Sequence, residues 1–361
     1  MFNLSSELDV GVVGSSNSAW ALSCYLSQSG FHVHILVRDY GRVKGLIKTA
    51  AICAEGKING VFKVQNITSD EKAFLDSVQT VFIATTATAY REVMARLAPY
   101  LRSDHSIILF SSKLGGVLEA YTCLRSSGIK NVRIIETDAL FACRITDDHT
   151  VWIRGFKGWN LFSSERKSST IQNAHLIRRF FPNLEPALNF IQRGLTDFGA
   201  MSHPLIMLIN MNAVDRKEKF LFYREGFTEE TIHLLESLEQ ERNTVADAYE
   251  TPLISLAELL DRYYDCRKDT LYETLLNVPN YRHSVAPDTL QHRYIFEDVS
   301  CTLVPLYHLA RKAKVKTPLI DALISMASVI LDRDFLKTGR SLSSFGLERK
   351  SGREIIRWMH S

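Results

Sequence analysis

The sequence predicts an α/β domain built on a parallel sheet, followed by an all-α domain. The chain has 361 residues, a length at which single hydrophobic cores stop growing and two domains are the usual arrangement. Short apolar runs alternate with helical patterns over roughly the first 150 residues, as in a sheet with crossover helices. After about Pro186 the helical period dominates. We therefore expect domains over residues 1–186 and 187–361.

The α/β half contains five predicted strands, each a short run of apolar residues. These strands are residues 9–13, 32–37, 80–84, 106–110 and 132–135. Two later runs, residues 151–154 and 160–162, are expected to form a further hairpin-like edge. Residues 163–173 (SSERKSSTIQN) are polar enough to predict a loop.

The second half is predicted to be helical throughout. Apolar residues recur at helical spacing over residues 319–330, and Thr317 followed by Pro318 is a typical N-cap and first helical position. Two more helices are expected, one opening after Thr228 and one over residues 306–313. No alternating strand pattern interrupts these helices.

The composition excludes several classes of function. Forty-three Lys and Arg nearly balance 40 Asp and Glu, and a formal charge of +3 predicts neither a nucleic-acid nor a membrane partner. The six cysteines form no Cys-x-x-Cys or Cys/His cluster, so we expect reduced thiols and no metal site. No apolar stretch reaches the ~20 residues of a membrane helix. The first residues carry no secretory signal, so we expect a cytoplasmic protein.

A glycine turn follows the first predicted strand. Gly14, Ser16 and Ala19 occupy the three positions of the G-x-G-x-x-G/A dinucleotide fingerprint, although Ser16 replaces the usual second glycine. Backbone N–H groups and hydroxyls at a helix N-terminus form a natural phosphate site. The alternative is an ordinary strand–helix turn. We expect a Rossmann-type dinucleotide-binding domain whose cofactor residues are Gly14, Ser15, Ser16, Asn17, Ser18, Ala19, Arg38 and Thr85.

The end of the second strand bears on the choice of cofactor. Arg38 and Asp39 lie about 20 residues beyond the glycine turn, where the adenosine ribose is recognised. An acidic residue there favours the 2′-hydroxyl of NAD, whereas an arginine can hold the 2′-phosphate of NADP. Because Arg38 directly follows the apolar run, we expect NADP to be preferred over NAD. A solvated surface arginine is the alternative.

Charged or reactive side chains follow other predicted strands. Lys113 follows the strand at 106–110, and Glu136 and Cys143 follow the strand at 132–135. Ligands of open parallel sheets lie beyond the carboxyl ends of the strands, so these residues are candidates for substrate binding, with solvated side chains as the alternative. In the helical half, His203 precedes Pro204, which is expected to start a helix. Taken alone, this histidine is expected to be a helix cap or a surface residue, with a catalytic histidine as the alternative.

Taken together, these segments resemble the opine dehydrogenases, the octopine/nopaline dehydrogenase family, over nearly the whole chain. The matching segments are the turn GSSNSA, the K-x-G-G turn followed by Glu119, ETDALFACR, SHP with Asn210 beyond it, FYREGFT, and residues 281–299, 315–324 and 333–347. The resemblance implies a Rossmann domain joined to a helical domain. It also implies an NAD(P)H-dependent oxidoreductase that couples an amino acid and a 2-oxo acid through an imine, giving an N-(carboxyalkyl)amino acid.

The same resemblance implies roles for three residues. His203 would be the catalytic histidine, Asp298 the carboxylate that orients it, and Arg293 the group that binds a substrate carboxylate. The residue types suit this chemistry, because imidazole titrates near neutrality and a planar guanidinium grips a carboxylate bidentately. Asp197 departs from the family pattern, which has Asn shortly before the histidine, and Ser300 stands where the family has Pro. These departures leave the identity of the substrates open.

Two other functions remain as alternatives. A ketopantoate-reductase-like enzyme would reduce a 2-oxo acid directly, but it normally uses a lysine at the start of the helical domain, where this chain offers His203. A nucleotide-sensing protein without catalysis would be consistent with Ser16. The expected partners are small molecules, an amino acid and a 2-oxo acid, and a homodimer is compatible with this prediction. We expect the substrates to lie near Lys113, Glu136, Cys143 and His203.

Overall fold

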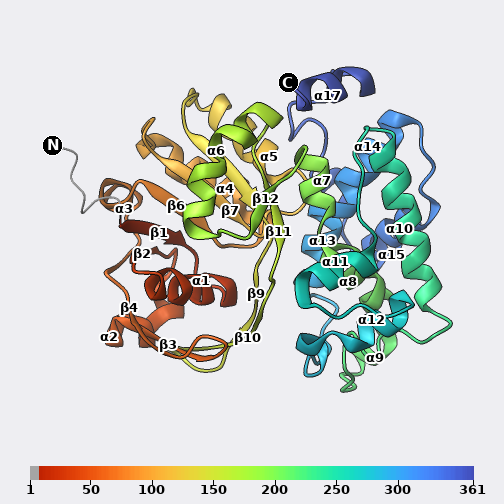
Figure 1. Cartoon of the computed structure of the whole chain (residues 1–361), viewed down its shortest axis with the longest axis horizontal. Coiled ribbons are helices and arrows are strands. Elements are labelled where there is room, and N and C mark those ends of the chain that lie inside the picture. The colour runs from red at the N-terminus through yellow and green to blue at the C-terminus, as the bar shows by residue number, and fades with distance from the viewer. Residues whose placement is uncertain (1–7) are drawn as a thin grey trace. The chain divides into compact units, whose positions relative to one another are not determined.

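The computed structural model describes residues 8–361 (Figure 1). Within them the chain divides into two compact units. The first comprises the residues up to Ser112 together with Ala120–Lys157 and Gln172–Leu184. The second comprises Lys113–Glu119, Gly158–Ile171 and Glu185–Ser361. Because the turn at Lys113 belongs to the second unit, the chain crosses between units several times before the helical half begins.

A parallel sheet forms the centre of the first unit. Its strands hydrogen-bond in the order β5-β2-β1-β6-β7-β8, and every pair is parallel. Their bounds are β1 Asp9–Val13, β2 His32–Leu36, β5 Asn66–Thr68, β6 Thr80–Ile83, β7 Ser106–Phe110 and β8 Arg133–Thr137. This order, with β1 in the middle and the chain turning outward on either side, is that of a dinucleotide-binding sheet. The predicted fold class is confirmed.

Buried apolar residues explain why these segments form strands covered by helices. All five residues of β7 are buried, as in a strand covered on both faces. The helices of this part of the chain are α1 Asn17–Gln28, α2 Lys44–Thr49, α3 Glu71–Ser77, α4 Tyr90–Leu97, α5 Gly116–Ser126 and α6 Lys167–Phe180. On α1 the side chains of Trp20, Leu22 and Leu26 are almost fully buried, so this helix is fixed by packing.

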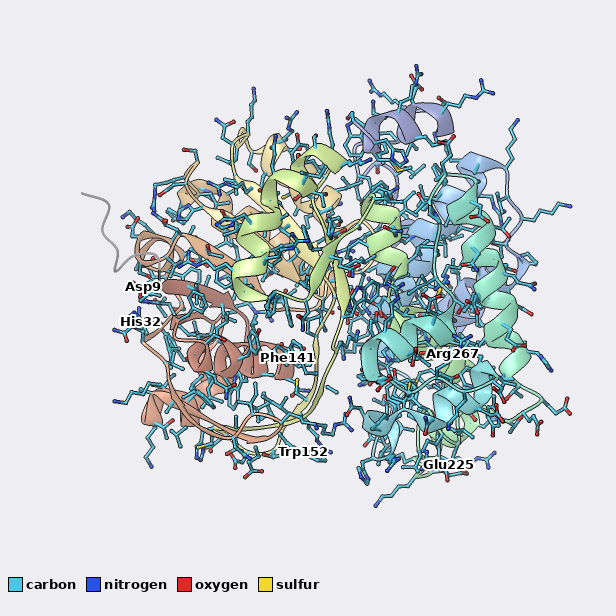
Figure 2. The ribbon with its side chains drawn as sticks, viewed as in Figure 1. Asp9, His32, Phe141, Trp152, Glu225 and Arg267 are labelled. Atoms are coloured by element: carbon cyan, nitrogen blue, oxygen red, sulfur yellow. The ribbon has the colours of Figure 1, made fainter. Side chains whose placement is uncertain are left out.

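A second, four-stranded sheet lies in the first unit, and the sequence did not predict it. Its order is β4-β3-β10-β9, with β3 Ala51–Gly56, β4 Gly60–Lys63, β9 Phe141–Ile145 and β10 Thr150–Phe156. Figure 2 labels Phe141 on β9 and Trp152 on β10. The hairpin-like edge expected from residues 151–154 and 160–162 is therefore wrong, because β10 pairs with β9 and β3. The short β9 and β4 contain too few buried residues to give a clear strand pattern.

The loop expected over residues 163–173 is also wrong. Helix α6 begins at Lys167. The buried side chains of Ile177 and Phe180 anchor the helix from its second half, which lies beyond the polar window. Tertiary burial thus overrides the local polarity of the first turns.

Among the described residues, the second unit is helical apart from the short strand β11 (Asn160–Ser163) and the last two residues of a second short strand, β12 (Leu184–Pro186). Its main helices are α7 Phe190–Leu195, α8 Phe198–Ile209, α9 Met211–Asp215, α10 Ile232–Asp247, α11 Leu256–Tyr264, α12 Leu271–Asn277, α13 Arg293–Asp298, α14 Val304–Ala313, α15 Pro318–Ile330, α16 Phe335–Thr338 and α17 Gly352–Met359. A π-helical segment, Val299–Leu303, joins α13 to α14. None of the helices in residues 8–361 combines the length and apolar character needed to cross a bilayer.

The helix starts predicted from the sequence were correct in one case and wrong in two. Thr317 is the N-cap of α15 with Pro318 at its first position, as expected. The helix expected directly after Thr228 begins only at Ile232. Pro204 does not start a helix, because it lies inside α8, which begins at Phe198. The capping side chain of Asp197, which accepts a hydrogen bond from the N–H of Ala200, fixes that earlier start.

Candidate functional site

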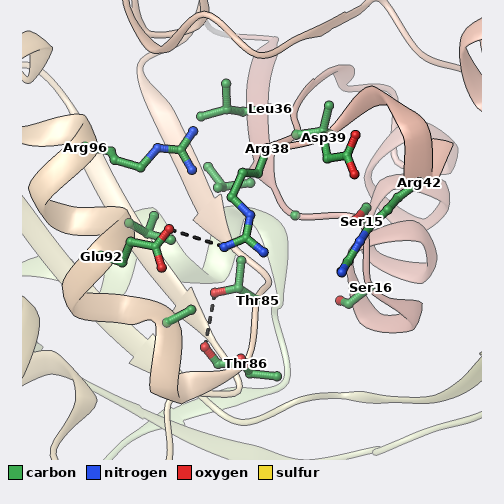
Figure 3. A pocket seen from close by; sticks show the side chains of 15 residues that line it. Ser15, Ser16, Leu36, Arg38, Asp39, Arg42, Thr85, Thr86, Glu92 and Arg96 are labelled. Atoms are coloured by element: carbon green, nitrogen blue, oxygen red, sulfur yellow. Dashed lines mark hydrogen bonds and ion pairs between the residues drawn. The ribbon is translucent and has the colours of Figure 1, made fainter.

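The first unit contains a cavity of about 330 Å³ beside the glycine turn (Figure 3). It extends from the end of β1 to the segment after β2 and along α4. Its lining is Val13, Gly14, Ser15, Ser16, Leu36, Val37, Arg38, Asp39, Arg42, Thr85, Thr86, Ala89, Glu92, Val93 and Arg96. The predicted cofactor residues Gly14, Ser15, Ser16, Arg38 and Thr85 thus line one cavity.

In the turn after β1 the backbone at Gly14 lies close to the backbone of Ala84. Gly14 has φ +129°, and a Cβ there would lie 2.8 Å from the carbonyl oxygen of Ala84, so only glycine fits. Ser16 is the N-cap of α1: its Oγ accepts from the N–H of Ala19 at 3.1 Å and donates to Ala84 O at 2.7 Å. Ser16 therefore has a structural role at the position where the fingerprint usually has glycine. The turn fits a dinucleotide phosphate at the start of α1.

Three arginines line this cavity, and the sequence analysis identified only Arg38. Arg38 extends toward Glu92, with 3.4 Å between Nη1 and Oε1, and both side chains are more than half exposed. Arg42 follows Asp39 in a 3-10 turn that Asp39 caps through the N–H of Gly41. Arg96, on the last turn of α4, is paired with Glu71. Aspartate is a typical cap of a short helical turn, so Asp39 was the sequence signal for a turn after β2 that brings Arg42 back to the cavity.

In the second unit, His203 lies in the middle of α8 and is buried. Its Nδ1 lies 2.8 Å from Oδ2 of Asp298 on α13, and its Nε2 lies 2.7 Å from the hydroxyl of Tyr223. The tautomer that satisfies both contacts carries the proton on Nδ1, donates it to Asp298 and accepts from Tyr223. The structure thus brings His203 and Asp298 together across 95 positions of sequence. Tyr223 was not identified from the sequence.

The surroundings of His203 favour its neutral form. Burial lowers the pKa of His203 below its usual value, and the positive charges of Lys113 and Arg293 add to that effect, while Asp298 opposes it. Burial raises the pKa of a carboxyl group, yet Lys113 and His203 together hold the pKa of Asp298 below its usual range. A neutral imidazole beside an ionised carboxylate is the starting state of a general base.

Lys113 belongs to this cluster. Its Nζ lies 2.7 Å from Oδ1 of Asp298 and 2.9 Å from Oδ2 of Asp197. All three side chains are buried. The ammonium group of Lys113 thus lies between two carboxylates of its own unit. Its role in substrate binding stays a prediction.

Buried polar contacts fix the turn that carries Lys113. Pro305 has no N–H, so the carbonyl of Cys301 lacks its usual helical partner and accepts instead from the N–H of Leu114 at 3.1 Å. The buried Arg193 donates to the carbonyl oxygen of Lys113 at 2.9 Å. Lys113 itself has φ +62°, a strained conformation for a residue with a side chain. The surrounding structure therefore determines where the ammonium group lies.

Arg293 begins α13, five residues before Asp298. Its Nη1 lies 3.3 Å from Oε2 of the buried Glu297, and its side chain is 49% exposed. On α13, Asp298 therefore contacts His203, whereas Arg293 contacts Glu297 and is partly exposed to solvent. A role for Arg293 in substrate binding stays a prediction. Arg293 combines a fixed orientation with an accessible edge.

Aromatic side chains pack around the imidazole. The ring of Tyr294 is stacked on His203 with 3.8 Å between centroids, and Phe222 and Tyr223 lie 5.9 Å away. On α8 itself, a Cβ at Gly199 would lie 2.6 Å from Cε1 of His203. Gly199 therefore makes room for the imidazole one turn further along its own helix.

Two other predicted site residues lie in the first unit. Glu136 is fully buried at the end of β8 and accepts a hydrogen bond from the Ser112 hydroxyl. Cys143 lies on β9 and is partly buried. A role for either residue in substrate binding stays a prediction.

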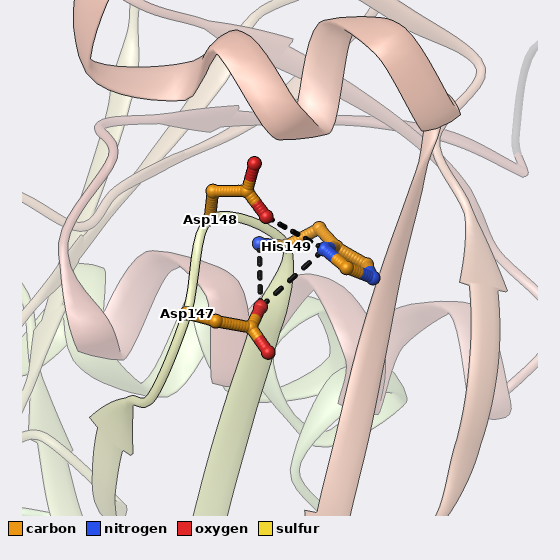
Figure 4. Close-up of side chains that lie close together, drawn as sticks. All are labelled: Asp147, Asp148 and His149. Atoms are coloured by element: carbon orange, nitrogen blue, oxygen red, sulfur yellow. Dashed lines mark hydrogen bonds and ion pairs between the residues drawn. The ribbon is translucent and has the colours of Figure 1, made fainter.

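A cluster of potential metal ligands lies in the turn between β9 and β10. Asp147, Asp148 and His149 have ligand atoms within 4.8 Å of one another (Figure 4). Both aspartates are exposed, and His149 Nδ1 lies 2.8 Å from Asp148 Oδ1. Exposed acidic groups of this kind are common on surfaces without a bound ion, and these contacts account for the arrangement.

Comparison with known proteins finds matches along the whole chain. The family described as NAD/NADP octopine/nopaline dehydrogenase, alpha-helical domain, matches residues 186–331, and ketopantoate reductase PanE/ApbA matches residues 10–112. An opine dehydrogenase of Arthrobacter sp. (strain 1C) is 32% identical over 338 residues, 93% of this chain and 94% of the relative.

Two solved structures share the fold. Octopine dehydrogenase in complex with NADH and agmatine has a TM-score of 0.77 at 20% identity, covering 97% of this chain and 98% of that one. Yersinopine dehydrogenase with bound NADP+ has a TM-score of 0.70 at 15% identity, covering 98% of both chains.

Proposed function

Because the chain belongs to the opine dehydrogenase family of NAD(P)-dependent oxidoreductases, we propose that it condenses an amino acid with a 2-oxo acid and reduces the resulting imine. The product is an N-(carboxyalkyl)amino acid. The observation that carries this proposal is the buried contact between His203 and Asp298, with Arg293 exposed at the other end of the same short helix. It combines a general base with a carboxylate-binding group.

His203 moves the proton that imine formation requires. The amino acid enters as an ammonium ion, and Nε2 of His203 accepts one of its protons, so that the amine replaces the Tyr223 hydroxyl as the partner of that nitrogen. The neutral amine attacks the oxo carbon, and a second N–H proton passes to the former oxo oxygen. The imidazolium then protonates the departing hydroxyl, which leaves as water. His203 is thereby restored, and the third N–H proton remains on a protonated imine. A nicotinamide cofactor would supply the hydride that reduces this species to the secondary amine.

Asp298 and Arg293 support different parts of this sequence. Asp298 holds the Nδ1 proton of His203 and stabilises the imidazolium. Arg293 would hold the carboxylate of the oxo acid through its exposed edge, while Glu297 keeps the guanidinium oriented. Holding both reactants in register contributes much of the rate acceleration.

The cofactor pocket supports a preference for NADPH. Arg38 and Arg42 both line the cavity beside the end of β2, where the adenosine 2′-position is recognised. Within residues 8–361, Arg38 pairs with the exposed carboxylate of Glu92 at 3.4 Å, a weak pair that a phosphate dianion can displace. Asp39 is engaged by the N–H of Gly41 at 2.7 Å, so one of its oxygens is already used within the protein.

The reaction is tested by the substrates that NADPH oxidation requires. Purified protein is incubated with NADPH and a panel of amino acids, 2-oxo acids, or both together, and absorbance at the nicotinamide band is followed. The proposal predicts oxidation only when both substrates are present, with one N-(carboxyalkyl)amino acid detected by mass spectrometry. Oxidation with the oxo acid alone would indicate a ketopantoate-reductase-like reaction. NADPH binding without oxidation under any combination would indicate a sensor.

A further inference from the structure

The buried carboxylate of Asp197 is linked through Lys113 to Asp298, the partner of His203. Lys113 contacts Asp197 at 2.9 Å and Asp298 at 2.7 Å, and Asp298 contacts His203 at 2.8 Å. The exposed fractions of the three charged side chains are 6% for Lys113, 4% for Asp197 and 2% for Asp298. A chain of close contacts therefore runs from Asp197 to the imidazole.

Asp197 determines the net charge of the buried cluster formed by Lys113, Asp197, Asp298 and His203. With His203 neutral, Lys113 contributes one positive charge and the two aspartates contribute two negative charges, which leaves one net negative charge. Protonation of His203 makes the cluster neutral. Without the charge of Asp197, the pair of Lys113 and Asp298 is already neutral, and an imidazolium would add an uncompensated positive charge to a buried site. Such a charge is costly in a medium of low dielectric constant.

Other groups around His203 do not supply this compensation. Helix α8 carries no second titratable side chain. From α13, Arg293 is paired with Glu297, and the N-cap His292 is held neutral because burial and Arg293 lower its pKa to about 4. Burial raises the pKa of Tyr223 well above its usual value, so this phenol carries no negative charge near pH 7. The positive charge of Lys113 lowers the pKa of His203. A negative charge that pairs with Lys113 therefore makes the imidazolium form of His203 easier to reach.

We propose that Asp197 is a positioning residue that acts through Lys113 to keep the imidazolium form of His203 accessible during turnover. This inference rests on the proposed function, in which His203 alternates between its neutral and protonated forms. Asp197 does not contact the imidazole in this account. It shares the ammonium group of Lys113, so that the negative charge of Asp298 remains available to His203.

Asp197 also has a structural role, which a conservative variant preserves. Its side chain caps α8 by accepting from the N–H of Ala200 at 3.1 Å. Asparagine caps helices about as well as aspartate, so Asp197→Asn keeps the helix start and removes the charge. Asp70 is a matched control, since it caps α3 by the same type of contact, with the N–H of Ala73 at 3.0 Å, and is exposed.

The test is the titration of His203 measured by NMR on histidine-labelled protein with NADP+ bound, with its signal assigned from a His203→Gln sample. We expect Asp197→Asn to lower the pKa of His203 by about one unit, the size typical of removing a nearby opposite charge, and Asp70→Asn to leave it unchanged. The acid limb of the kcat/KM profile should move in the same direction. An unchanged titration in a folded Asp197→Asn protein, or an equal shift in Asp70→Asn, would overturn the proposal.

The titration separates this inference from the proposed function. It requires no turnover, so a wild-type protein that fails the two-substrate assay can still show the shift caused by Asp197→Asn. Conversely, a wild-type protein that is active with both substrates, and whose titration is unaffected by Asp197→Asn, retains the proposed reaction and loses only the role of Asp197.

Discussion

In the cavity of the first unit Arg38 is exposed and weakly paired, whereas Lys113, Asp197 and Asp298, which lie beside His203, are buried and closely paired. Arg38 is 66% exposed and meets one carboxylate at 3.4 Å, while Asp298 is 2% exposed and contacts both a lysine and a histidine within 2.8 Å. An exposed arginine can exchange partners when a phosphate arrives. A buried cluster keeps its geometry, and a charge removed from it is not replaced by water. Substitutions in the two regions should therefore have different consequences.

The largest effect is expected at Asp298. Asp298→Asn keeps the shape of the side chain but removes the charge that stabilises the imidazolium, so we expect kcat to fall by about 10²-fold or more. NADPH affinity should be unchanged, because Arg38 and the glycine turn are not altered. Asp321→Asn, which breaks an exposed ion pair with Arg311, is the control and should retain kcat. A kcat close to that of the wild type for Asp298→Asn would contradict this account.

The exposed region is probed at Arg38. A charge-assisted contact to a phosphate contributes roughly 1.5–3 kcal/mol, so Arg38→Gln should weaken NADPH binding by about 10- to 100-fold. NADH lacks the phosphate and should be affected by less than about threefold. Fluorescence titration of both cofactors measures the two values. An equal loss for NADPH and NADH would show that Arg38 does not recognise the phosphate.

A smaller effect is expected at Gly199, where the added methyl group would press on the imidazole. A Cβ there lies 2.6 Å from Cε1 of His203, so the ring must shift in Gly199→Ala. A misplaced catalytic group lowers the rate strongly, and we expect kcat to fall by about tenfold. Gly352→Ala, at a helical position where a Cβ meets nothing within 4 Å, is the matched control. Full activity in Gly199→Ala would show that the imidazole tolerates displacement.

The smallest effect concerns acid stability. Burial and Arg293 lower the pKa of His292 to about 4, and its Nδ1 accepts from the N–H of Tyr294 as the cap of α13. In the unfolded chain this histidine binds a proton near pH 6.5, whereas in the folded chain it stays neutral down to about pH 4. The neutral His292 cap therefore contributes fully to the free energy of unfolding above pH 6.5, and that contribution is lost as the pH falls toward 4.

The contribution of His292 can be isolated with a second cap residue. His292→Asn keeps a capping side chain and removes the titration, so its stability relative to wild type should rise by about 1–2 kcal/mol between pH 7 and pH 4. Urea unfolding at both pH values measures this difference. The exposed His175→Asn serves as control and should show no such change. A constant difference across this pH range would exclude the role given to His292.

The sequence predicted the first region better than the second for a physical reason. Strand β1, the glycine turn and Arg38 lie within 30 residues, so local patterns identify them. The cluster around His203 draws Lys113, Asp197, Tyr223 and Asp298 from four distant segments, and only the resemblance to opine dehydrogenases singled out His203 and Asp298. That family assignment is confirmed. The contact of Lys113 with two aspartates depends on the turn at Leu114 docking on Cys301, which no local pattern encodes.

The missed strand β3 and the wrongly placed start of α8 have a related cause. Strand β3 was overlooked because it follows a short helix and pairs with β10, about 100 positions later in the chain. Pro204 was taken as a helix start because proline is frequent there. The apolar residues that precede it are buried and extend α8 toward the N-terminus, and Asp197 provides the cap. In both cases distant or neighbouring packing determines the element.

The most direct test of the central claim is a comparison of NADPH binding and turnover in His203→Ala. The account predicts that this variant folds and binds NADPH with the affinity of the wild type, because the cavity of the first unit is untouched. It also predicts that turnover with an amino acid and a 2-oxo acid falls by at least about 10²-fold, since no other group at this position takes the proton of the amine. Near-normal turnover in the folded variant would contradict the assignment of His203 as the catalytic base.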